Sequence, residues 1–436
     1  MSKKLFIKTF GCAMNTRDSD HIIAELKEKE NYSLTENAKE ADLIILNTCS
    51  VREKPERKLF SEIGIYANIK KPNAKIGICG CTASALGAEI IKKAPSVDFV
   101  LGARNVSKIT NIIKNPKAVE VEINYDESNY EFCMNTESNI RALINISIGC
   151  DKKCSYCIVP HTRGKEISIP LEMILKEAEI RVKNGAKEII LLGQNVNNYG
   201  ARFSTPPKTT DKKINFTYLL QEISKIKEIK RIKFVSPHPL HMDDEFIEEF
   251  ARNEKIVKYI HMPLQSGSNK VLKDMKRGYS REWFLDRVNK IKSLCPNVGI
   301  GTDIIVAFPN ENENDFYDTL EIVKEVEFDT MYSFIYSPRK DTLAFHLKEI
   351  DSKIATNRLE ILQNLHKQIL EKKAKNEINK IHKVMIENIK DTMSEGRSDN
   401  GRVIKIQNKK LNLGEIYNVV ITNNENGSLF GSLVNV

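Results

Sequence analysis

The chain has 436 residues, of which 41% are hydrophobic and 29% charged, and its formal net charge is +9. This is the composition of an ordinary water-soluble protein, long enough for two or three domains with separate cores. No apolar run approaches the ~20 residues that span a bilayer, and the first apolar stretch is too short for a secretion signal, so we expect a cytoplasmic protein without a membrane partner. The positive charge favours a polyanionic partner such as RNA without deciding it.

The nine cysteines are an odd number in a chain for which we expect no export. A disulfide framework is therefore disfavoured, and metal ligation or catalysis is favoured.

The first third alternates short apolar strands with amphipathic helices, the first of them over residues 18–29 and the second over about 53–68. The predicted strands cover residues 4–10, 42–46, 75–79 and 98–101. This alternation predicts a doubly wound parallel sheet, in which the carboxyl ends of the strands share one edge and ligands bind there.

Three cysteines follow the ends of predicted strands: Cys12, Cys49 and Cys81. Singly, each would more often be a small core residue, but three at the same offset predict a site at one sheet edge. Gly11 and Gly80 allow the backbone to approach a bulky ligand. Cys79 lies inside a strand and is predicted to be core. We assign residues 1–118 to this domain. A polar linker over about 115–138 follows, with a short strand at 119–123 and Cys133, to which no role is assigned.

Residues 149–158, after the apolar run 142–148, carry three more cysteines at spacings of four and three: Cys150, Cys154 and Cys157. Three thiolates suit iron or zinc, and three ligands leave one position of an iron–sulfur cube open. A zinc knuckle, or a ferredoxin-like site with a distant fourth cysteine, is the alternative that the spacing leaves.

Beyond this loop, strand–loop units recur, and we assign residues 136–368 to one domain. The predicted strands cover residues 142–148, 188–192, 231–235, 259–262, 301–307 and 330–334. Six units, fewer than the eight of a full barrel, predict a partial parallel barrel with a side opening for a large substrate. Loops 193–195 and 265–268 are best placed to bind a cofactor, although ordinary turn chemistry explains them equally well. His238, His241 and His261 lack ligand spacing and are predicted to be satisfied core or rim residues.

The tail, residues 371–436, follows a charged helical region at 351–380. Its short strands are predicted at residues 384–386, 402–406, 416–421 and 428–434, which suggests a small barrel of the OB type. Lys and Arg outnumber Asp and Glu by eleven to seven over residues 372–436. The predicted phosphate contacts of a bound RNA are Arg397, Arg402, Lys405, Lys409 and Lys410.

These motifs together resemble a known family. The CxxxCxxC loop, with Tyr156 before its last cysteine, resembles the radical S-adenosylmethionine (SAM) motif. Segments 9–15, 47–54 and 80–83 resemble the N-terminal motifs of the methylthiotransferases, and the tail is similar to their TRAM domain. The resemblance covers essentially the whole chain and is nearest to the group that acts on N6-isopentenyladenosine in tRNA.

The resemblance implies two [4Fe–4S] clusters. Cys150, Cys154 and Cys157 would hold the one that cleaves SAM, with SAM chelating its open iron and releasing a 5′-deoxyadenosyl radical on reduction. Cys12, Cys49 and Cys81 would hold an auxiliary cluster that delivers sulfur. The SAM contacts expected on this basis are Tyr156, Gln194, Asn195, Gln265, Ser266, Thr302 and Asp303. Lys152, Lys153, Arg163 and Lys165 would favour the SAM carboxylate electrostatically, and a plain solvated surface is the alternative.

The implied reaction replaces the C2 hydrogen of N6-isopentenyladenosine, next to the tRNA anticodon, with a methylthio group. It uses two SAM molecules, one for the methyl group and one for hydrogen abstraction. An unactivated C–H bond is not acidic enough to be broken by acid–base catalysis, which agrees with radical chemistry carried by a cofactor. We further expect a flavodoxin or ferredoxin as electron donor, and a monomer.

Two segments depart from the family pattern. Lys340-Asp341 and Leu343 stand where Pro-Gly and Pro are common, and residues 165–169 lack a usual arginine, which puts details of substrate contact in doubt. Sister enzymes acting on threonylcarbamoyl-adenosine or on a ribosomal protein are the near alternatives. A non-catalytic iron–sulfur protein or a zinc-binding RNA module is the distant one, but each lacks a local fourth cysteine.

Overall fold

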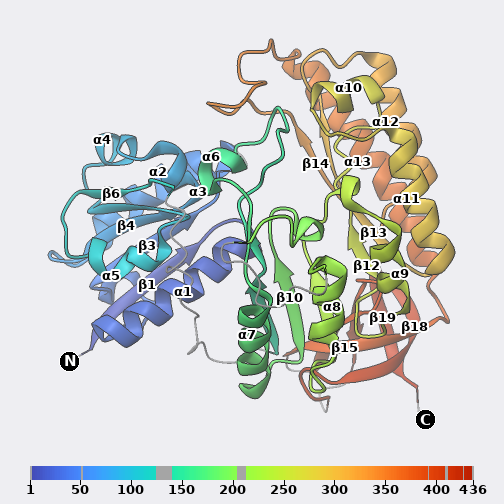
Figure 1. The fold of residues 1–436 in the computed structure, drawn as a ribbon, viewed down its shortest axis with the longest axis horizontal. Helices are drawn as coiled ribbons and strands as arrows, with labels where there is room; N and C mark the ends of the chain where they lie inside the picture. The colour runs from blue at the N-terminus through green and yellow to red at the C-terminus, as the bar shows by residue number, and fades with distance from the viewer. Residues whose placement is uncertain are drawn as a thin grey trace.

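The computed structural model describes residues 2–50, 53–123, 140–203, 213–390, 392–407, 411–425 and 427–434, with the backbone alone for 53–57. Three bodies are visible in Figure 1: an N-terminal sheet covered by helices, a central half-open barrel and a small β-barrel at the C-terminus. The α/β class predicted from the sequence is confirmed. Cys133, Lys409 and Lys410 lie outside the described residues. No helix in the described part of the chain is long and apolar enough to cross a membrane.

The N-terminal elements alternate as the sequence predicts. They are β1 (Lys3–Thr9), α1 (Ala13–Glu30), β2 (Tyr32–Leu34), β3 (Leu43–Thr48), α2 (Glu53–Ile69), β4 (Lys75–Gly80), α3 (Cys81–Leu86), α4 (Glu89–Lys93), β5 (Phe99–Gly102), α5 (Ile109–Ile112) and β6 (Ala118–Glu120). The six strands form a wholly parallel sheet in the order β2-β1-β3-β4-β5-β6. Ile44 and Leu46 of β3 pack into one core, and Leu43 and Ile45 into a second core on the other face. The sheet is therefore doubly wound, with side chains alternating between its faces.

The central body consists of parallel strands lined on the outside by helices. Its elements are β7 (Arg141–Asn145), β8 (Ser147–Ile148), α6 (Val159–Arg163), β9 (Ile167–Ser168), α7 (Leu171–Lys183), β10 (Glu188–Leu192), α8 (Phe216–Ser224), β11 (Arg231–Phe234), α9 (Asp244–Arg252), β12 (Tyr259–His261), α10 (Asn269–Asp274), α11 (Arg281–Leu294), β13 (Gly299–Val306), α12 (Glu313–Val326), β14 (Thr330–Ile335) and α13 (Ser352–Lys375). Strands β7, β10 and β11 form one parallel sheet and β12, β13 and β14 another, joined by a parallel bridge between Ile232 and Ile256. These are the six strands of the predicted partial barrel.

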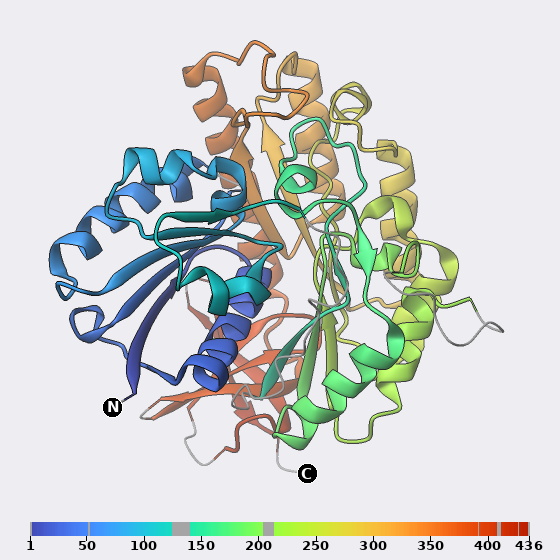
Figure 2. The same cartoon turned by 60° about the vertical axis from the view of Figure 1, so that its left-hand side comes forward.

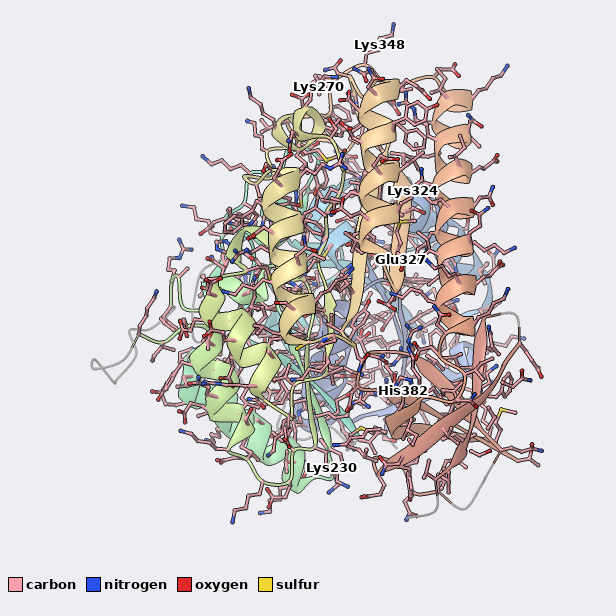
Figure 3. All side chains as sticks on the ribbon, turned by 90° about the vertical axis from the view of Figure 1, so that its right-hand side faces the viewer. Lys230, Lys270, Lys324, Glu327, Lys348 and His382 are labelled. Carbon is pink, nitrogen blue, oxygen red and sulfur yellow. The ribbon has the colours of Figure 1, made fainter. Side chains whose placement is uncertain are left out.

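The outer helices close the back of the barrel. Figure 3 shows α12 and α13 side by side on this face, and Lys372 of α13 pairs with Glu327 at the end of α12 at 2.8 Å. The N-terminal domain lies beside the barrel on its opposite side, with the tail beneath both (Figure 2). Between domain and barrel, Arg17 of α1 forms a buried ion pair of 2.9 Å with Glu177 of α7.

Helix α1 begins five residues earlier than the apolar pattern predicts, at Ala13 in place of residue 18. Asn15, Arg17, Asp18 and Ser19 are buried in its first turns, because this end of the helix packs against polar groups of the barrel and of the cysteine loops. A helix prediction based on the spacing of apolar residues misses a turn whose buried residues are polar. The predicted strand 142–148 is likewise divided, because β8 leaves the barrel and pairs antiparallel with β9.

The tail is a closed five-stranded barrel in the order β15-β16-β17-β19-β18. Its strands are β15 (Ile381–Lys390), β16 (Met393–Ser398), β17 (Val403–Ile406), β18 (Ile416–Glu425) and β19 (Ser428–Leu433). It docks on the amino ends of the central strands: Arg231 at the start of β11 donates to the Arg397 carbonyl at 2.7 Å, and Arg402 pairs with Asp329, next to β14, at 2.9 Å. The cysteine loop lies at the opposite, carboxyl end of these strands.

Glu377 joins α13 to the tail, and its charge should make this junction sensitive to acid. Its carboxylate accepts hydrogen bonds from His382 at 2.7 Å and Lys380 at 3.1 Å, and Arg402 lies 3.6 Å away. Figure 3 places His382 between the lower end of α13 and the tail. Burial alone would raise the pKa of Glu377, but the hydrogen bonds and the Arg402 charge outweigh it and lower the pKa from 4.5 to about 2.

The pKa of Glu377 is lower in the folded state than in the unfolded chain, so its stabilisation is complete above about pH 4.5 and is lost as the pH falls toward 2. We expect Glu377→Gln to lower the free energy of unfolding by roughly 1–3 kcal/mol at pH 7. The difference in Tm between the two proteins should shrink as the pH falls below 4.5. The exposed Glu371→Gln serves as the control and should not change Tm. A Tm difference that is independent of pH would contradict the assignment.

Candidate functional site

The cysteines that follow β1, β3 and β4 lie on three neighbouring strands at one edge of the N-terminal sheet. Cys12 is the residue before α1, Cys49 comes directly after β3, and Cys81 opens α3. The amide oxygen of Asn15 is 4.0 Å from the sulfurs of both Cys12 and Cys81. A Cβ on Gly11 would lie 2.5 Å from that of Cys49, so glycine is required for this close approach. The predicted convergence of this edge is therefore present in the fold.

Arg163, the last residue of α6, reaches across from the barrel to this edge. Its Nε–H donates to the Cys81 sulfur at 3.2 Å, and its Nη2 donates to Asn15 at 3.0 Å and to the Asp18 carboxylate at 2.7 Å. Helices α3 and α6 are in contact and adjacent in Figure 1. The Arg163 side chain is therefore held among groups of the N-terminal domain, and its predicted electrostatic effect on a SAM carboxylate stays a prediction.

The second set of cysteines occupies the loop between β8 and α6. The loop is closed by backbone hydrogen bonds from Cys150 to Gly164 at 3.0 Å and from Cys157 to Cys154 at 3.1 Å. Arg277, buried after α10, donates to the Cys154 sulfur at 3.3 Å. Each set thus has one buried arginine on one sulfur, a feature that the sequence patterns did not indicate.

Burial governs the protonation of this loop. Desolvation raises the pKa of Cys150 to about 11, and desolvation together with the Cys154 charge raises that of Cys157 to about 12. Without a metal these thiols stay protonated at neutral pH, and iron binding would displace the protons.

Both sets fit an iron–sulfur cluster. In the described part of the chain no three His, Cys, Asp or Glu side chains are close enough to hold a single metal ion. This is expected for a cubane, whose cysteine ligands bind three different irons and are therefore farther apart than ligands of one ion. The donors are all thiols, and the arginines offset part of the charge of the thiolates.

The first three expected SAM contacts surround the cysteine loop. Tyr156 packs against an apolar cluster that includes Phe308 and Tyr336, and its hydroxyl accepts from Arg277 at 3.4 Å. Gln194 accepts from the Gly149 amide at 2.7 Å and contacts Met14 of α1. Asn195 is fully buried and its side-chain amide donates to Glu166 at 3.3 Å, while its side-chain amide oxygen, Oδ1, has no hydrogen-bond partner. Asn195 thus offers an acceptor to a ligand.

The other four expected SAM contacts lie on β13 and on the loop after β12. Gln265 has a φ of 77° and pairs through its backbone with Asp303 and Ile305. The hydroxyl of Ser266 accepts from the Ser268 amide at 3.2 Å. The hydroxyl of Thr302 on β13 donates to the Met262 carbonyl and accepts from the Leu264 amide, both in the loop after β12. These hydroxyls support the loop.

Asp303 contacts His261 at 3.0 Å. His238 and His241 differ from the prediction, because the Nε2 atom of each is buried without a hydrogen-bond partner.

The described cationic residues of the predicted RNA surface differ in how their side chains are held by neighbouring groups. Arg402 is fixed in the ion pairs with Asp329 and Glu377, so it joins the tail to the barrel. Arg397 binds the Gly401 carbonyl at 3.0 Å and lies 3.5 Å from Glu387, and Lys405 lies over the Phe430 ring.

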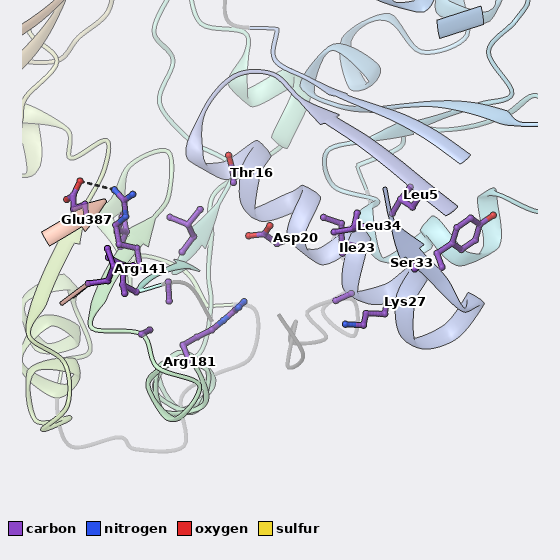
Figure 4. A pocket seen from close by; sticks show the side chains of 18 residues that line it. Leu5, Thr16, Asp20, Ile23, Lys27, Ser33, Leu34, Arg141, Arg181 and Glu387 are labelled. Atoms are coloured by element: carbon purple, nitrogen blue, oxygen red, sulfur yellow. Dashed lines mark hydrogen bonds and ion pairs between the residues drawn. The ribbon is translucent and has the colours of Figure 1, made fainter. Parts of the chain in front are cut away.

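A cleft of about 930 Å³ lies between α1 and the amino end of the barrel, and none of the described cysteines lines it. Asp20 and Lys27 of α1 face Arg181 and the Arg141–Glu387 ion pair across it (Figure 4). Its lining contains none of the predicted site residues.

Comparisons with known proteins agree with this geometry. Residues 144–323 match the radical SAM superfamily, and residues 4–102 match the uncharacterized protein family UPF0004. A radical SAM methyltransferase, TsrM of Kitasatospora setae, superposes with a TM-score of 0.55 at 11% identity, covering 79% of this chain and 77% of its own. The cobalamin-dependent radical enzyme OxsB superposes with a TM-score of 0.50 at 12% identity, covering 83% of this chain and 56% of its own. These likenesses concern the fold.

Full-length relatives are far more similar. A tRNA-2-methylthio-N6-dimethylallyladenosine synthase of Helicobacter hepaticus is 61% identical over 99% of this chain and 94% of its own. A synthase of the same name from Helicobacter pylori is 60% identical over 98% of this chain and 99% of its own. The chain therefore belongs to the tRNA-2-methylthio-N6-dimethylallyladenosine synthase family and is a radical SAM tRNA methylthiotransferase.

Proposed function

We propose that this protein converts N6-isopentenyladenosine next to the tRNA anticodon to its 2-methylthio derivative, with two [4Fe–4S] clusters and two molecules of SAM. The observation that carries the proposal is the pair of three-cysteine sets joined by α6, each with a buried arginine on one sulfur. Its support from relatives is the name of the synthases that are about 60% identical over almost the whole chain.

In this proposal the two sets have separate roles. Cys150, Cys154 and Cys157 hold the cluster that, when bound, supplies an electron for SAM cleavage. Cys12, Cys49 and Cys81 hold the auxiliary cluster and present sulfur to the substrate. The five-residue helix α6 follows the loop of the second set, and its last residue, Arg163, contacts Cys81 of the first set. This connection suits a reaction that needs hydrogen abstraction and sulfur delivery at the same carbon.

Other side chains of the protein then bind the ligand and orient the cysteine loop. The unpaired side-chain amide oxygen of Asn195 accepts a hydrogen bond from a ligand at the barrel mouth. Arg277 holds Tyr156 and the Cys154 sulfur together and keeps the loop in register with α10. We assign residues 1–118 to the auxiliary-cluster domain, 136–368 to the radical SAM core and 371–436 to the tail. We further propose that tRNA phosphates are contacted by Arg397, Lys405, Lys409 and Lys410. An electron donor of flavodoxin or ferredoxin type supplies the electrons, and the protein acts as a monomer.

Nucleoside mass spectrometry tests this function directly. We expect tRNA from a host that lacks its own synthase to gain 2-methylthio-N6-isopentenyladenosine when this gene is expressed, with a matching loss of the unmodified nucleoside. The same digest reports methylthiolated threonylcarbamoyl-adenosine, the product of a sister enzyme. Unchanged isopentenyladenosine, in cells whose purified protein carries iron, would reject the proposal.

A further inference from the structure

Arg163 lies between the N-terminal domain and the barrel, and its guanidinium touches a cysteine sulfur. It follows Cys157 by six residues and is thus part of the radical SAM loop, yet its guanidinium lies among Asn15, Asp18 and Cys81. Only 2% of its surface is exposed, and it is the largest side chain among the fully buried ones. A cation buried to this degree needs anionic partners.

The anionic partner of Arg163 is the Asp18 carboxylate at 2.7 Å, and the Cys81 sulfur lies 3.2 Å from the Arg163 Nε. An arginine guanidinium is charged at neutral pH, and here its Nε–H donates to the Cys81 sulfur while its Nη2 donates to the oxygens of Asn15 and Asp18. Because Asn15 also lies 4.0 Å from the sulfurs of Cys12 and Cys81, one cation orders this whole group.

We propose that Arg163 is a positioning residue of the auxiliary cluster: it fixes the Cys81 ligand to the radical SAM loop and raises the reduction potential of that cluster. The inference rests on the proposed role of Cys12, Cys49 and Cys81. A hydrogen bond from a cation to a ligand sulfur favours the reduced, more negative state of a cluster. The same contact determines how the sulfur-delivering edge faces the loop that binds SAM.

An ion pair that merely holds the two domains together is the simpler reading, and the molecule contains a matched example. Arg17 is also buried at this interface, and its guanidinium pairs with the Glu177 carboxylate at 2.9 Å. Loss of Arg17 should therefore weaken the interface without changing the cluster. Loss of Arg163 should change both.

The test uses the full-length chain with Cys150, Cys154 and Cys157 replaced by alanine, so that only the auxiliary cluster remains. Arg163→Gln is made in an Asp18→Asn background, which leaves no unpaired buried charge, and is compared with Asp18→Asn alone. Arg163→Lys keeps the charge and removes the Nε–H donor, and Arg17→Met is the interface control. Iron content and the reduced fraction at a fixed applied potential, read by electron paramagnetic resonance, are measured for each protein.

We expect the iron content to stay the same and the ratio of reduced to oxidised cluster to fall about ten-fold on loss of Arg163, the size expected for one hydrogen bond to a charged group. Arg163→Lys should shift the ratio in the same direction by less, and Arg17→Met should not shift it. An unchanged ratio in a protein with normal iron would overturn this inference and leave the proposed function standing. Absence of iron from the starting protein would instead overturn the auxiliary site itself, and the inference with it.

Discussion

Replacement of Cys150, Cys154 and Cys157 together with alanine should abolish the reductive cleavage of SAM and leave about half of the iron bound. The reason is that these thiols are the only protein ligands proposed for the SAM-cleaving cluster, and no fourth cysteine of the described chain lies in the loop between β8 and α6. The unaltered chain should bind about eight irons after anaerobic reconstitution, and the variant about four. Formation of 5′-deoxyadenosine, measured with a chemical reductant, should fall to the rate without enzyme.

The control for this experiment is Cys295→Ala, since Cys295 is buried at the end of α11 and belongs to neither set. It should retain both clusters and the cleavage of SAM. Cleavage that persists in the triple variant would show that the loop is not the SAM site. A wild-type content of about four irons would exclude the second cluster.

The fold could be predicted from the sequence because the spacing of apolar residues and the position of strand ends are local properties of the chain. The parallel N-terminal sheet and the six strands of the partial barrel follow from alternating apolar segments. The convergence of Cys12, Cys49 and Cys81 follows from the rule that parallel strands share a carboxyl edge. No knowledge of side-chain direction was needed for either prediction.

The roles of Arg163 and Arg277 could not be predicted in this way, because they depend on contacts with residues far away in the sequence. Arg163 lies beside the radical SAM loop in sequence, which suggests a partner in that loop, but the contact between α3 and α6 turns it toward Cys81. Arg277 is more than a hundred residues from Cys154, and its neighbours Lys276 and Gly278 form no motif. Buried polar residues in the first turn of α1 were missed for the related reason that their partners belong to another domain.

The position of the tail bears on how a tRNA would be held. Its barrel is fixed to the amino ends of the central strands by Arg231, Arg402 and Asp329, whereas the cysteine loop is at their carboxyl end. A substrate that contacts both must run along the outside of the barrel. This arrangement suits a long polyanion, whose phosphates can bind the tail while one base enters the mouth.

Replacement of Cys12, Cys49 and Cys81 together with alanine should have the opposite consequence to the variant of the loop. The chain should keep about four irons and still cleave SAM, but form no methylthio-nucleoside, because the proposed source of sulfur is lost. The measurement pairs 5′-deoxyadenosine with the modified nucleoside in one anaerobic reaction containing isopentenylated tRNA.

Cys79→Ala is the matched control for the N-terminal set. Cys79 is two residues from Cys81 but lies within β4, is 1% exposed and belongs to the same hydrophobic core as Leu5 and Phe99. Loss of its sulfur should cost about 1 kcal/mol of stability and no modification of tRNA. If the triple variant still formed the methylthio product, sulfur would have to come from elsewhere, and the convergence of three strand ends would need another explanation. If instead it lost SAM cleavage as well, the two cysteine sets would depend on one another for assembly, and the contact of Arg163 with Cys81 is the path through which that dependence would act.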